Sequence, residues 1–380
     1  MLFSTPILTS QESEVLQRIE AAHRQLAYSF TQPRRWVGLL RRNMFARGIR
    51  GSNSIEGYNV TPEDALAAAE GQAPLDADET TWAAIVGYRN AMTYVLQLSN
   101  DPHFTYQESL IRSLHFMMLH YDLTKHPGQW RPGVIYVRND EIGEIVFEGP
   151  DAESVPGLIG ELVSWLNTAD AMEPVMVRAA MAHLDFVMIH PFSDGNGRMA
   201  RCLHTLVLAR EQILHPSFCS IEEYLGRNTA EYYRVLEEVG QKKWNPGLDA
   251  RGWVRFSLKA HYFQAVTLQR RAKEMGKLWD ALEQEIHKRS LHERMMIALS
   301  DAAIGLHVRN STYRTAAEVS DAVAQRDLKT LVDAGLLIPE GEKRGRVYRR
   351  SDSLAHIYEA IREPRKIEDP FSKSSQQRLL

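Results

Sequence analysis

The sequence predicts a mainly α-helical protein with one β-hairpin and a smaller C-terminal unit, and three observations support this. Apolar residues recur at steps of three or four along most of the chain, as Val15 and Ile19 do within 11–29. Residues 134–148 instead place β-branched and aromatic residues on both sides of a polar turn, which is typical of a hairpin. From about residue 289 the pattern changes to short helical segments followed by two short strand-like runs.

Length and composition indicate a globular protein of more than one folding unit. The chain has 380 residues, whereas one ordinary domain holds roughly 100–200, so two or three units are expected. Hydrophobic residues make up 44% and charged residues 24%, as in folded domains. The net charge of −3 argues against a protein that coats nucleic acid over its whole surface, but it is compatible with a local basic patch.

The cysteines and the N-terminus predict the compartment. Cys202 and Cys219 are the two cysteines, so there is no disulfide framework and a reducing compartment is expected. The N-terminus has neither the basic segment nor the apolar stretch of a signal peptide. No uncharged apolar run approaches the roughly 20 residues that span a bilayer. We therefore expect a soluble, cytoplasmic protein with no membrane partner.

Periodicity and end signals place the helices. Thr61 reads as an N-cap and Pro62 as the first helical residue of a short helix. Asn245, Pro246 and Gly247 mark the start of a segment that is either one long helix or a broken pair. The helices expected on these grounds are 11–29, 79–98, 105–121, 154–168, 173–190, 198–213, 229–240 and 249–288.

The densest chemistry lies between two of these helices. Pro191 ends the first helix, because proline cannot continue its amide ladder, and a polar loop with glycines leads into the second. Amides at a helix N-terminus bind anions, and glycines allow a phosphate to come close. Arg198 and Arg201 lie on one helix face and suit a polyphosphate, while Asp194 offers a hard oxygen to Mg²⁺. His190 is placed to take a proton from an attacking hydroxyl.

The string HPFSDGNGRMAR (190–201) resembles the signature of the Fic family at every defined position. The flanking segments WRPGVIYVRND and EGPDAESVPGLIGELVSWLN also resemble the family, and the likeness extends from roughly residue 30 to 290. It implies a Fic-type helical core with a β-hairpin flap. The implied activity is that of a protein adenylyltransferase, which moves AMP from ATP to Tyr, Thr or Ser hydroxyls of proteins, including its own.

The resemblance also assigns roles within the loop. His190 would be the general base, and Asp194 would hold the Mg²⁺ that bridges the α- and β-phosphates. Arg198 would stabilise charge on the leaving pyrophosphate, and Arg201 would contact the γ-phosphate. The hole for the α-phosphate would be formed by Gly195, Asn196 and Gly197.

Two further features follow from the same resemblance. The hairpin at 134–148 would be a flap that holds a target segment by strand pairing. Tyr232 and Tyr233 lie where relatives place aromatic residues near the adenine, although paired tyrosines on a helix are more often core or interface residues.

An upstream string predicts autoinhibition. Ser52 and Glu56 are four residues apart and share a face if the segment is helical, and Gly57 fits a helix end. The string GSNSIEG (51–57) resembles the inhibitory motif of Fic proteins, in which the glutamate pairs with the second arginine of the loop, here Arg201. The same glutamate could instead position water for removal of AMP from a modified target, and the sequence leaves this alternative open.

The C-terminal unit has the element order of a winged helix. Helices are expected at 291–303, 315–321 and 323–334, with Gly335 as the residue that ends the third. The run LLIPEGEKRGRVYRR then predicts two short strands around a basic turn. Such a unit could bind DNA phosphates through its basic residues or could dock another protein, and both alternatives stay open.

The predicted organisation therefore has four parts and several rival functions. The parts are an N-terminal helical region (1–100) with an inhibitory helix at about 50–57, a Fic core (101–288), a winged helix (289–362) and a disordered tail (363–380). The chain contains neither a phosphate-binding Gly-x-x-x-x-Gly-Lys-Ser/Thr loop nor a His-Asp dipeptide, which argues against a kinase and a metal phosphohydrolase. Transfer of another nucleotide, a DNA-binding regulator with a Fic core, and a homodimer remain open alternatives.

Overall fold

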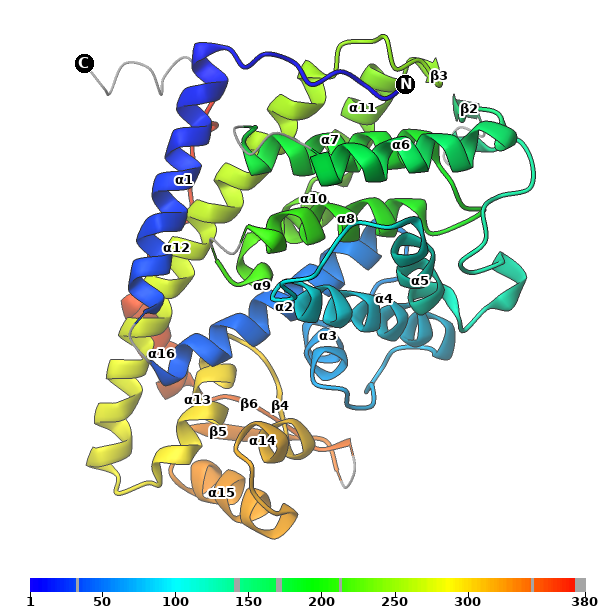
Figure 1. The fold of residues 1–380 in the computed structure, drawn as a ribbon. Helices are drawn as coiled ribbons and strands as arrows, with labels where there is room; N and C mark the ends of the chain where they lie inside the picture. The colour runs from blue at the N-terminus through cyan, green and yellow to red at the C-terminus, as the bar shows by residue number, and fades with distance from the viewer. Residues whose placement is uncertain (32–33, 140–143, 169–172, 212–213, 343–344, 373–380) are drawn as a thin grey trace.

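One long helix organises the molecule. The computed structural model describes residues 1–31, 34–139, 144–168, 173–211, 214–342 and 345–372. In it α12 (Arg251–Lys288) runs along one side as a single helix, and α1 (Ser10–Phe30) lies beside it (Figure 1). α1 begins with a capping box, in which the Thr9 hydroxyl accepts the Glu12 N–H and the Glu12 carboxylate accepts the Thr9 N–H at 2.7 Å.

Two helices form the centre of the fold. α7 (Val175–Ile189) and α8 (Asn196–Arg210) pack against each other and are joined by residues 190–195. Almost every side chain of both helices is buried, as expected of helices enclosed on all sides. α12 is tied to this pair, because the indole N–H of Trp253 donates to the Ala180 carbonyl at 2.6 Å. The loop between α7 and α8 is therefore held by the best-packed part of the protein.

The helix α2 (Arg35–Ile55) crosses beneath α8 and was not predicted at its full length. The helix expected at about 50–57 is the end of this longer element. Its closest neighbour is α10 (Glu222–Arg227), and a Cβ at Gly51 would lie 2.5 Å from the Glu222 carbonyl oxygen. Glycine is required there because the two backbones meet. Arginine, glycine and polar residues interrupt the apolar pattern of α2, so periodicity alone did not reveal it.

The remaining helices of the body surround this centre. α4 (Glu79–Leu98) packs on α8, α6 (Val155–Thr168) packs on α7, and α5 (Glu108–Leu119) packs on both α4 and α6. The expected start at Thr61 is confirmed, because its hydroxyl accepts the Asp64 N–H at 3.1 Å. The bounds are α3 (Pro62–Ala69), α4 (Glu79–Leu98), α5 (Glu108–Leu119), η1 (Leu123–Lys125), η2 (Ala152–Ser154), α6 (Val155–Thr168), α9 (Pro216–Cys219) and α11 (Thr229–Gly240).

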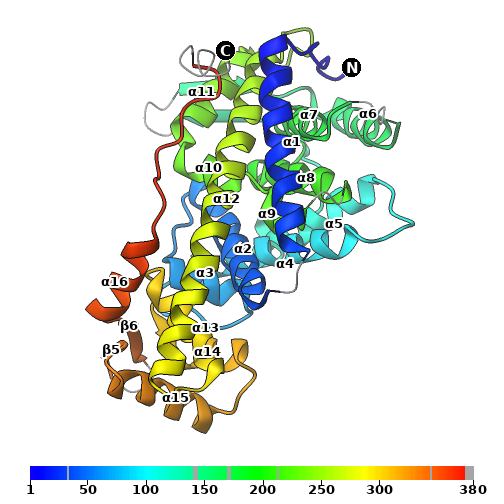
Figure 2. The same cartoon turned by 90° about the vertical axis from the view of Figure 1, so that its left-hand side faces the viewer.

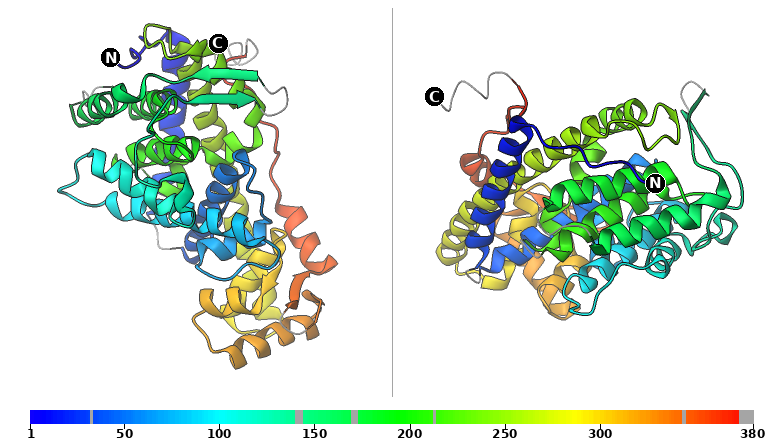
Figure 3. Two further views of the ribbon diagram at one scale, coloured as in Figure 1. Left: turned by 90° about the vertical axis from the view of Figure 1, so that its right-hand side faces the viewer. Right: turned by 45° about the horizontal axis from the view of Figure 1, so that its top comes forward.

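The predicted hairpin is confirmed. β1 (Tyr136–Asn139) and β2 (Glu144–Glu148) pair antiparallel, with Tyr136 opposite Glu148, and most of the expected turn, 140–143, lies outside the described residues. The short strand β3 (Lys242–Lys243) joins β2 in parallel, so β1 is an edge strand of the sheet. The hairpin projects at one end of the body, as Figure 3 shows.

A separate unit follows α12 at the opposite end of the molecule (Figure 1). Its sheet has the order β4 (Val308–Arg309), β6 (Val347–Arg350), β5 (Leu337–Glu340), with antiparallel neighbours. Gly335 follows α15 with φ +69°, as expected, but the helix predicted at 315–321 is wrong, because Ser320 is the N-cap of α15. The elements are η3 (Glu293–Met295), α13 (Met296–Ala303), β4 (Val308–Arg309), α14 (Asn310–Ala316), α15 (Asp321–Asp333), β5 (Leu337–Glu340), β6 (Val347–Arg350) and α16 (Asp352–Ile361).

The prediction of a disordered tail is wrong for residues 363–372. Figure 2 shows the segment after α16 running along α12 toward α11. Glu363 pairs with Lys277 at 2.7 Å, and the guanidinium of Arg255 lies 4.1 Å from the centre of the Phe371 ring. The polar composition of this segment gave no sign of these partners, which come from a distant helix. Residues 373–380 lie outside the described part. Among the described helices, none combines the length and apolar character needed to cross a membrane.

Candidate active site

The loop 190–195 is shaped by two residues in the left-handed region. His190 ends α7 with φ 52° and ψ 58°, and Gly195 precedes α8 with φ 76°. Such a backbone costs a non-glycine residue about 1–3 kcal/mol, so other contacts must hold it. Arg131 supplies two of them: its Nε donates to the His190 carbonyl and its backbone N–H donates to the Pro191 carbonyl, both at 2.9 Å.

The side chain of Asn196 closes the loop from within. Its Oδ1 accepts the Phe192 N–H at 2.9 Å, and its Nδ2 donates to the Phe192 carbonyl at 2.8 Å. The side chain is almost fully buried. The side-chain amide of Asn196 therefore holds the shape of the loop, and any contribution of Asn196 to the expected phosphate hole would come from its backbone.

His190 has one ring nitrogen engaged and one available as a base. Its Nδ1 lies 3.1 Å from the Val187 carbonyl oxygen, which can only accept, so Nδ1 carries the proton and Nε2 keeps its lone pair. Burial lowers the pKa of His190 to about 4. The imidazole is therefore neutral at physiological pH, which is the state in which it can accept a proton.

His115 supports the same loop and was not identified from the sequence. Its Nδ1 accepts the Gly128 N–H at 2.8 Å, so its Nε2 donates to the Asp194 carbonyl at 2.9 Å. Its ring stacks on Phe192 with centroids 3.6 Å apart. Like Arg131, it lies far upstream of the loop, and no local pattern marks either residue; Arg131 does fall within the segment WRPGVIYVRND that resembles the family.

Asp194 forms an ion pair with the ammonium group of Lys125. Its Oδ2 lies 2.6 Å from Nζ of Lys125, and its Oδ1 accepts the Gly195 N–H at 2.6 Å. Burial raises the pKa of Asp194, but Lys125 and Arg198 lower it by more, so the carboxylate is ionised. A partly exposed carboxylate that attracts an ammonium group fits a divalent cation as well. Nowhere in the described ranges do three or more His, Cys, Asp or Glu side chains gather as a metal site.

Arg198 is buried with unused hydrogen-bond donors. The residue is 1% exposed, its guanidinium lies 5.2 Å from the centre of the Tyr58 ring, and its Nε and Nη1 have no partner. Buried donors without a partner are uncommon in folded proteins. No side chain caps the N-terminus of α8. The unused guanidinium donors and the first amides of α8 together provide what a phosphate requires.

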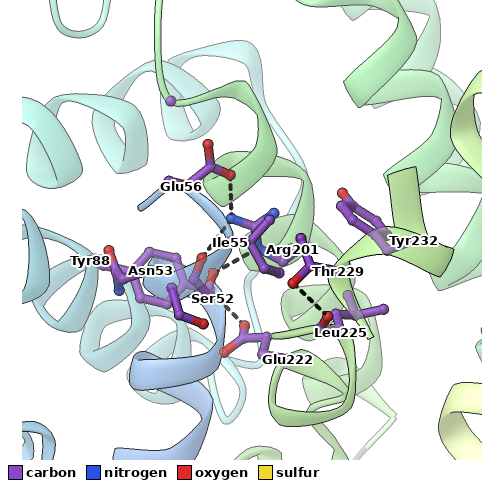
Figure 4. A network of polar contacts seen from close by, with 12 residues as sticks. Ser52, Asn53, Ile55, Glu56, Tyr88, Arg201, Glu222, Leu225, Thr229 and Tyr232 are labelled. Carbon is purple, nitrogen blue, oxygen red and sulfur yellow. Dashed lines mark hydrogen bonds and ion pairs between the residues drawn. The ribbon is translucent and has the colours of Figure 1, made fainter. Parts of the chain in front are cut away.

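Arg201 is held by the end of α2 (Figure 4). Its Nε donates to the Ser52 hydroxyl at 2.8 Å, and its Nη2 donates to the Ser52 carbonyl at 2.9 Å and to Glu56 Oε1 at 2.6 Å. Burial lowers the pKa of Arg201, but Glu56 raises it by more, so the charge is retained. A Cβ on Gly197 would lie 2.5 Å from Glu56 Oε1, so this carboxylate lies against the first turn of α8.

The comparisons with known proteins agree with this geometry. Residues 105–208 match the family model described as Fic/DOC family. These residues are therefore similar to a Fic domain. The matched range includes the loop, the hairpin, His115, Lys125 and Arg131.

Relatives of the Fic domain carry names that state an activity. A protein adenylyltransferase fic-1 of Caenorhabditis briggsae is 39% identical over 27% of this chain and 18% of its own length. A protein adenylyltransferase Fic of Drosophila mojavensis is 30% identical over 57% of this chain and 39% of its own length. A probable protein adenylyltransferase of Aquifex aeolicus is 35% identical over 21% of this chain and 25% of its own length. This chain therefore spans well under half of each of these relatives.

Solved structures show the same fold. A Fic family protein of Desulfovibrio desulfuricans superposes with a TM-score of 0.57 at 22% identity, covering 92% of this chain and 98% of that one. A Fic-1 fragment of Caenorhabditis elegans gives a TM-score of 0.53 at 23% identity, covering 68% and 72%. At this identity the likeness concerns the fold, which is mainly helical with a small hairpin.

The two tyrosines near the Fic domain have different surroundings. Tyr232 is 1% exposed, and its hydroxyl lies 3.0 Å from Nε2 of His183 in a cluster with Trp253. Its ring is therefore part of the packed interior, and the expectation that it contacts adenine is not supported. Tyr233 is 48% exposed, and its hydroxyl donates to the Ile55 carbonyl next to Glu56. Tyr233 is the one of the pair that a nucleotide could reach.

Proposed function

We propose that this protein is an adenylyltransferase that moves AMP from ATP to hydroxyl groups of proteins, itself included. The observation that carries the proposal is the neutral His190, with Nε2 free, in the loop that leads into the N-terminus of α8, which no side chain caps, and the unused donors of Arg198. A base beside a polyphosphate site is what nucleotidyl transfer to an alcohol requires. The names of the relatives support the same reaction.

In the proposed step, Nε2 of His190 accepts the hydroxyl proton of the target while the hydroxyl oxygen attacks the α-phosphorus. The bond from that phosphorus to the bridging oxygen breaks, and pyrophosphate leaves with the electron pair. Arg198 and the first amides of α8 stabilise negative charge on the phosphates. Because Arg131, His115 and Asn196 hold the loop, these groups need little rearrangement during the reaction.

Asp194 would hold Mg²⁺ in this proposal, together with phosphate and water oxygens. The residue fits, because its carboxylate is ionised and already attracts the ammonium group of Lys125. When bound, the ion would neutralise charge on the phosphates. Lys125 would then have to leave Oδ2 or share it.

Glu56 would act as a brake. Its carboxylate lies against Gly197 at the N-terminus of α8 and pairs with Arg201, which was expected to contact the γ-phosphate. The Glu56 carboxylate thus lies where a phosphate of ATP would bind, and it pairs with Arg201, the residue expected to contact that phosphate. ATP bound with Glu56 in place would adopt an unproductive arrangement, as the resemblance to the inhibitory motif implies.

The hairpin would present the target. β1 is an edge strand, and Val134, Tyr136 and Ile145 expose apolar side chains on this part of the molecule. An extended segment of another protein could pair with the edge of β1 and bring its hydroxyl to His190. Such pairing depends on backbone hydrogen bonds. It would therefore select targets by their accessible extended segments and not by a particular amino-acid sequence.

The decisive experiment is intact mass spectrometry of the protein after incubation with Mg²⁺ and each of the four nucleoside triphosphates. Wild type, Glu56→Gly and His190→Ala are compared. An AMP adduct that appears with ATP and requires His190 supports the proposal, and an adduct from another nucleotide would reassign the substrate. To test removal of AMP, protein modified by Glu56→Gly is incubated with wild type, and loss of the adduct would assign that second reaction.

A second function is favoured by the C-terminal unit. We propose that residues 289–362 form a winged helix that binds DNA. A groove on this unit is lined by four basic side chains and one acid, namely Arg309, Arg314, Lys329, Arg346 and Asp321. Electrophoretic mobility shifts with the full-length protein at two salt concentrations test this. We expect salt-sensitive binding that Lys329→Ala and Arg346→Ala together weaken. Binding that is absent, or that ignores both substitutions, would favour docking of a protein.

A further inference from the structure

A polar cavity lies beside the first half of α2, away from the 190–201 loop. Its volume is about 770 Å³, and it is enclosed by α2, α10, α12 and the segment after α16, which runs beside α12 (Figure 2). None of its lining residues belongs to the 190–201 loop, and Ser52 and Glu56 do not line it either. The cavity is therefore separate from the proposed active site.

Positive charge dominates the cavity wall. Seven of its lining side chains are cationic and four are acidic. Three guanidiniums converge on the single carboxylate of Glu223: Arg271 contacts it through both terminal nitrogens at 2.6 and 2.7 Å, Arg227 at 2.7 Å and Arg47 at 3.4 Å. The Glu223 carboxylate neutralises only one of the three positive charges that contact it. Burial, and then the nearby Arg271, lower the pKa of Arg47 to about 10.

Two buried donors that line the same cavity lack partners. Asn43 is 7% exposed and its Nδ2 has no hydrogen-bond partner. The Nε of Arg270 is also buried without a partner. Unsatisfied buried donors are costly, so their presence beside excess positive charge indicates a place for an acceptor that carries negative charge.

Part of the cavity lining, here called the aromatic wall, is apolar and aromatic. Met44, Phe263, Tyr224 and Tyr358 form it, and the rings of Tyr224 and Phe263 have centroids 5.5 Å apart. Small-molecule sites of roughly 300–1,000 Å³ typically combine such an apolar wall with a few polar groups. Arginine clusters are the usual partners of phosphate groups, because the planar guanidinium bonds two oxygens at once.

We propose that this cavity binds a small phosphorylated molecule, with its phosphate on Arg47, Arg227 and Arg270 and an apolar or planar part against the aromatic wall. The site lies on the first half of α2, whose last turn carries the Ser52 and Glu56 contacts to Arg201. The ligand would be either a nucleotide or a molecule bound through phosphate groups alone, and the two are distinguished by the probes below.

The test is calorimetric titration of the full-length protein with pyrophosphate and with AMP. The variant is Arg227→Glu, which replaces a side chain that is 61% exposed and should leave folding intact. The matched control is Arg234→Glu on α11, a side chain that is 56% exposed, pairs with Glu238 and does not line the cavity. We expect Arg227→Glu to weaken one binding event at least tenfold and Arg234→Glu to leave it unchanged.

The two probes separate the sources of the ligand. Tighter binding of AMP than of pyrophosphate would indicate a nucleotide that uses the aromatic wall, and the reverse would indicate recognition through phosphate groups alone. Failure of both probes to bind, or binding that is equally strong in Arg227→Glu, would overturn the proposal. The result does not depend on the proposed transferase activity, because no turnover is measured.

Discussion

The carboxylate of Glu56 lies 2.6 Å from Nη2 of Arg201 and also contacts the N-terminal turn of α8 at Gly197. These residues are 145 positions apart in the chain. A helix N-terminus and a buried arginine are the two features that bind anions best, and here an internal carboxylate occupies both. The side chain of Glu56 remains 24% exposed, so the contact can be opened without unfolding the core.

Glu56→Gln should release this contact while keeping the shape of the side chain. The neutral amide loses the charge that holds Arg201, so we expect auto-modification with labelled ATP to rise by about tenfold or more, since a shift of ~1.4 kcal/mol corresponds to that factor. The rate of auto-modification in Glu56→Gly should rise by at least the same factor. Glu238→Gln, an exposed ion-pair residue on α11, is the control and should stay at the wild-type rate. Equal rates of auto-modification in the wild type and the three variants would show that Glu56 does not inhibit the reaction.

The rate of adenylylation should show no inflection at about pH 6.5, the pKa of an ordinary histidine. In the proposed mechanism, protonation of His190 would abolish its function as a base, and burial lowers its pKa to about 4. The rate controlled by this group is therefore lost only as the pH falls toward 4, and it should stay level between about pH 5 and 8. A histidine of pKa 6.5 would lose about nine tenths of its activity by about pH 5.5. Single-turnover rates at saturating ATP and Mg²⁺ distinguish the two profiles.

Lys125→Ala should reduce the Mg²⁺ concentration needed for activity. In the wild type the ammonium of Lys125 pairs with Asp194 Oδ2, where it would compete with the proposed Mg²⁺. Without this competitor, half-maximal activity should require several-fold less Mg²⁺. The measurement is a Mg²⁺ titration of the adenylylation rate in the Glu56→Gly background, with Lys242→Ala as the control. A higher Mg²⁺ requirement would show that Lys125 assists the metal or the phosphates instead.

Asn196→Ala should damage both stability and activity. The change leaves the Phe192 N–H and carbonyl without their partners inside the protein, at a cost of about 1–3 kcal/mol. We expect a lower urea midpoint and a slower reaction at saturating ATP. Asn196→Asp keeps the acceptor for the N–H and should lie between the two proteins in stability. A variant as stable and active as the wild type would mean that the loop keeps its shape without this side chain.

Several elements could be predicted because their signals are local. The helix 229–240, the cap at Thr61 and the hairpin each depend on residues within a few positions of one another. The loop 190–201 was predicted for a related reason: its histidine, acid, glycines and arginines are consecutive in the chain. The full length of α2 and the docking of 363–372 were missed, because both are stabilised by contacts with distant helices.

The amino-acid sequence by itself indicated most of the helices, the position of the loop 190–201 and the side chains proposed as base and metal ligand. Only the tertiary structure decided how those groups are used. It turned Asn196 inward, buried Tyr232 and placed Lys125 on Asp194. The physical reason is that periodicity and capping act over a few residues, whereas burial and charge pairing depend on segments that only the folded chain brings together.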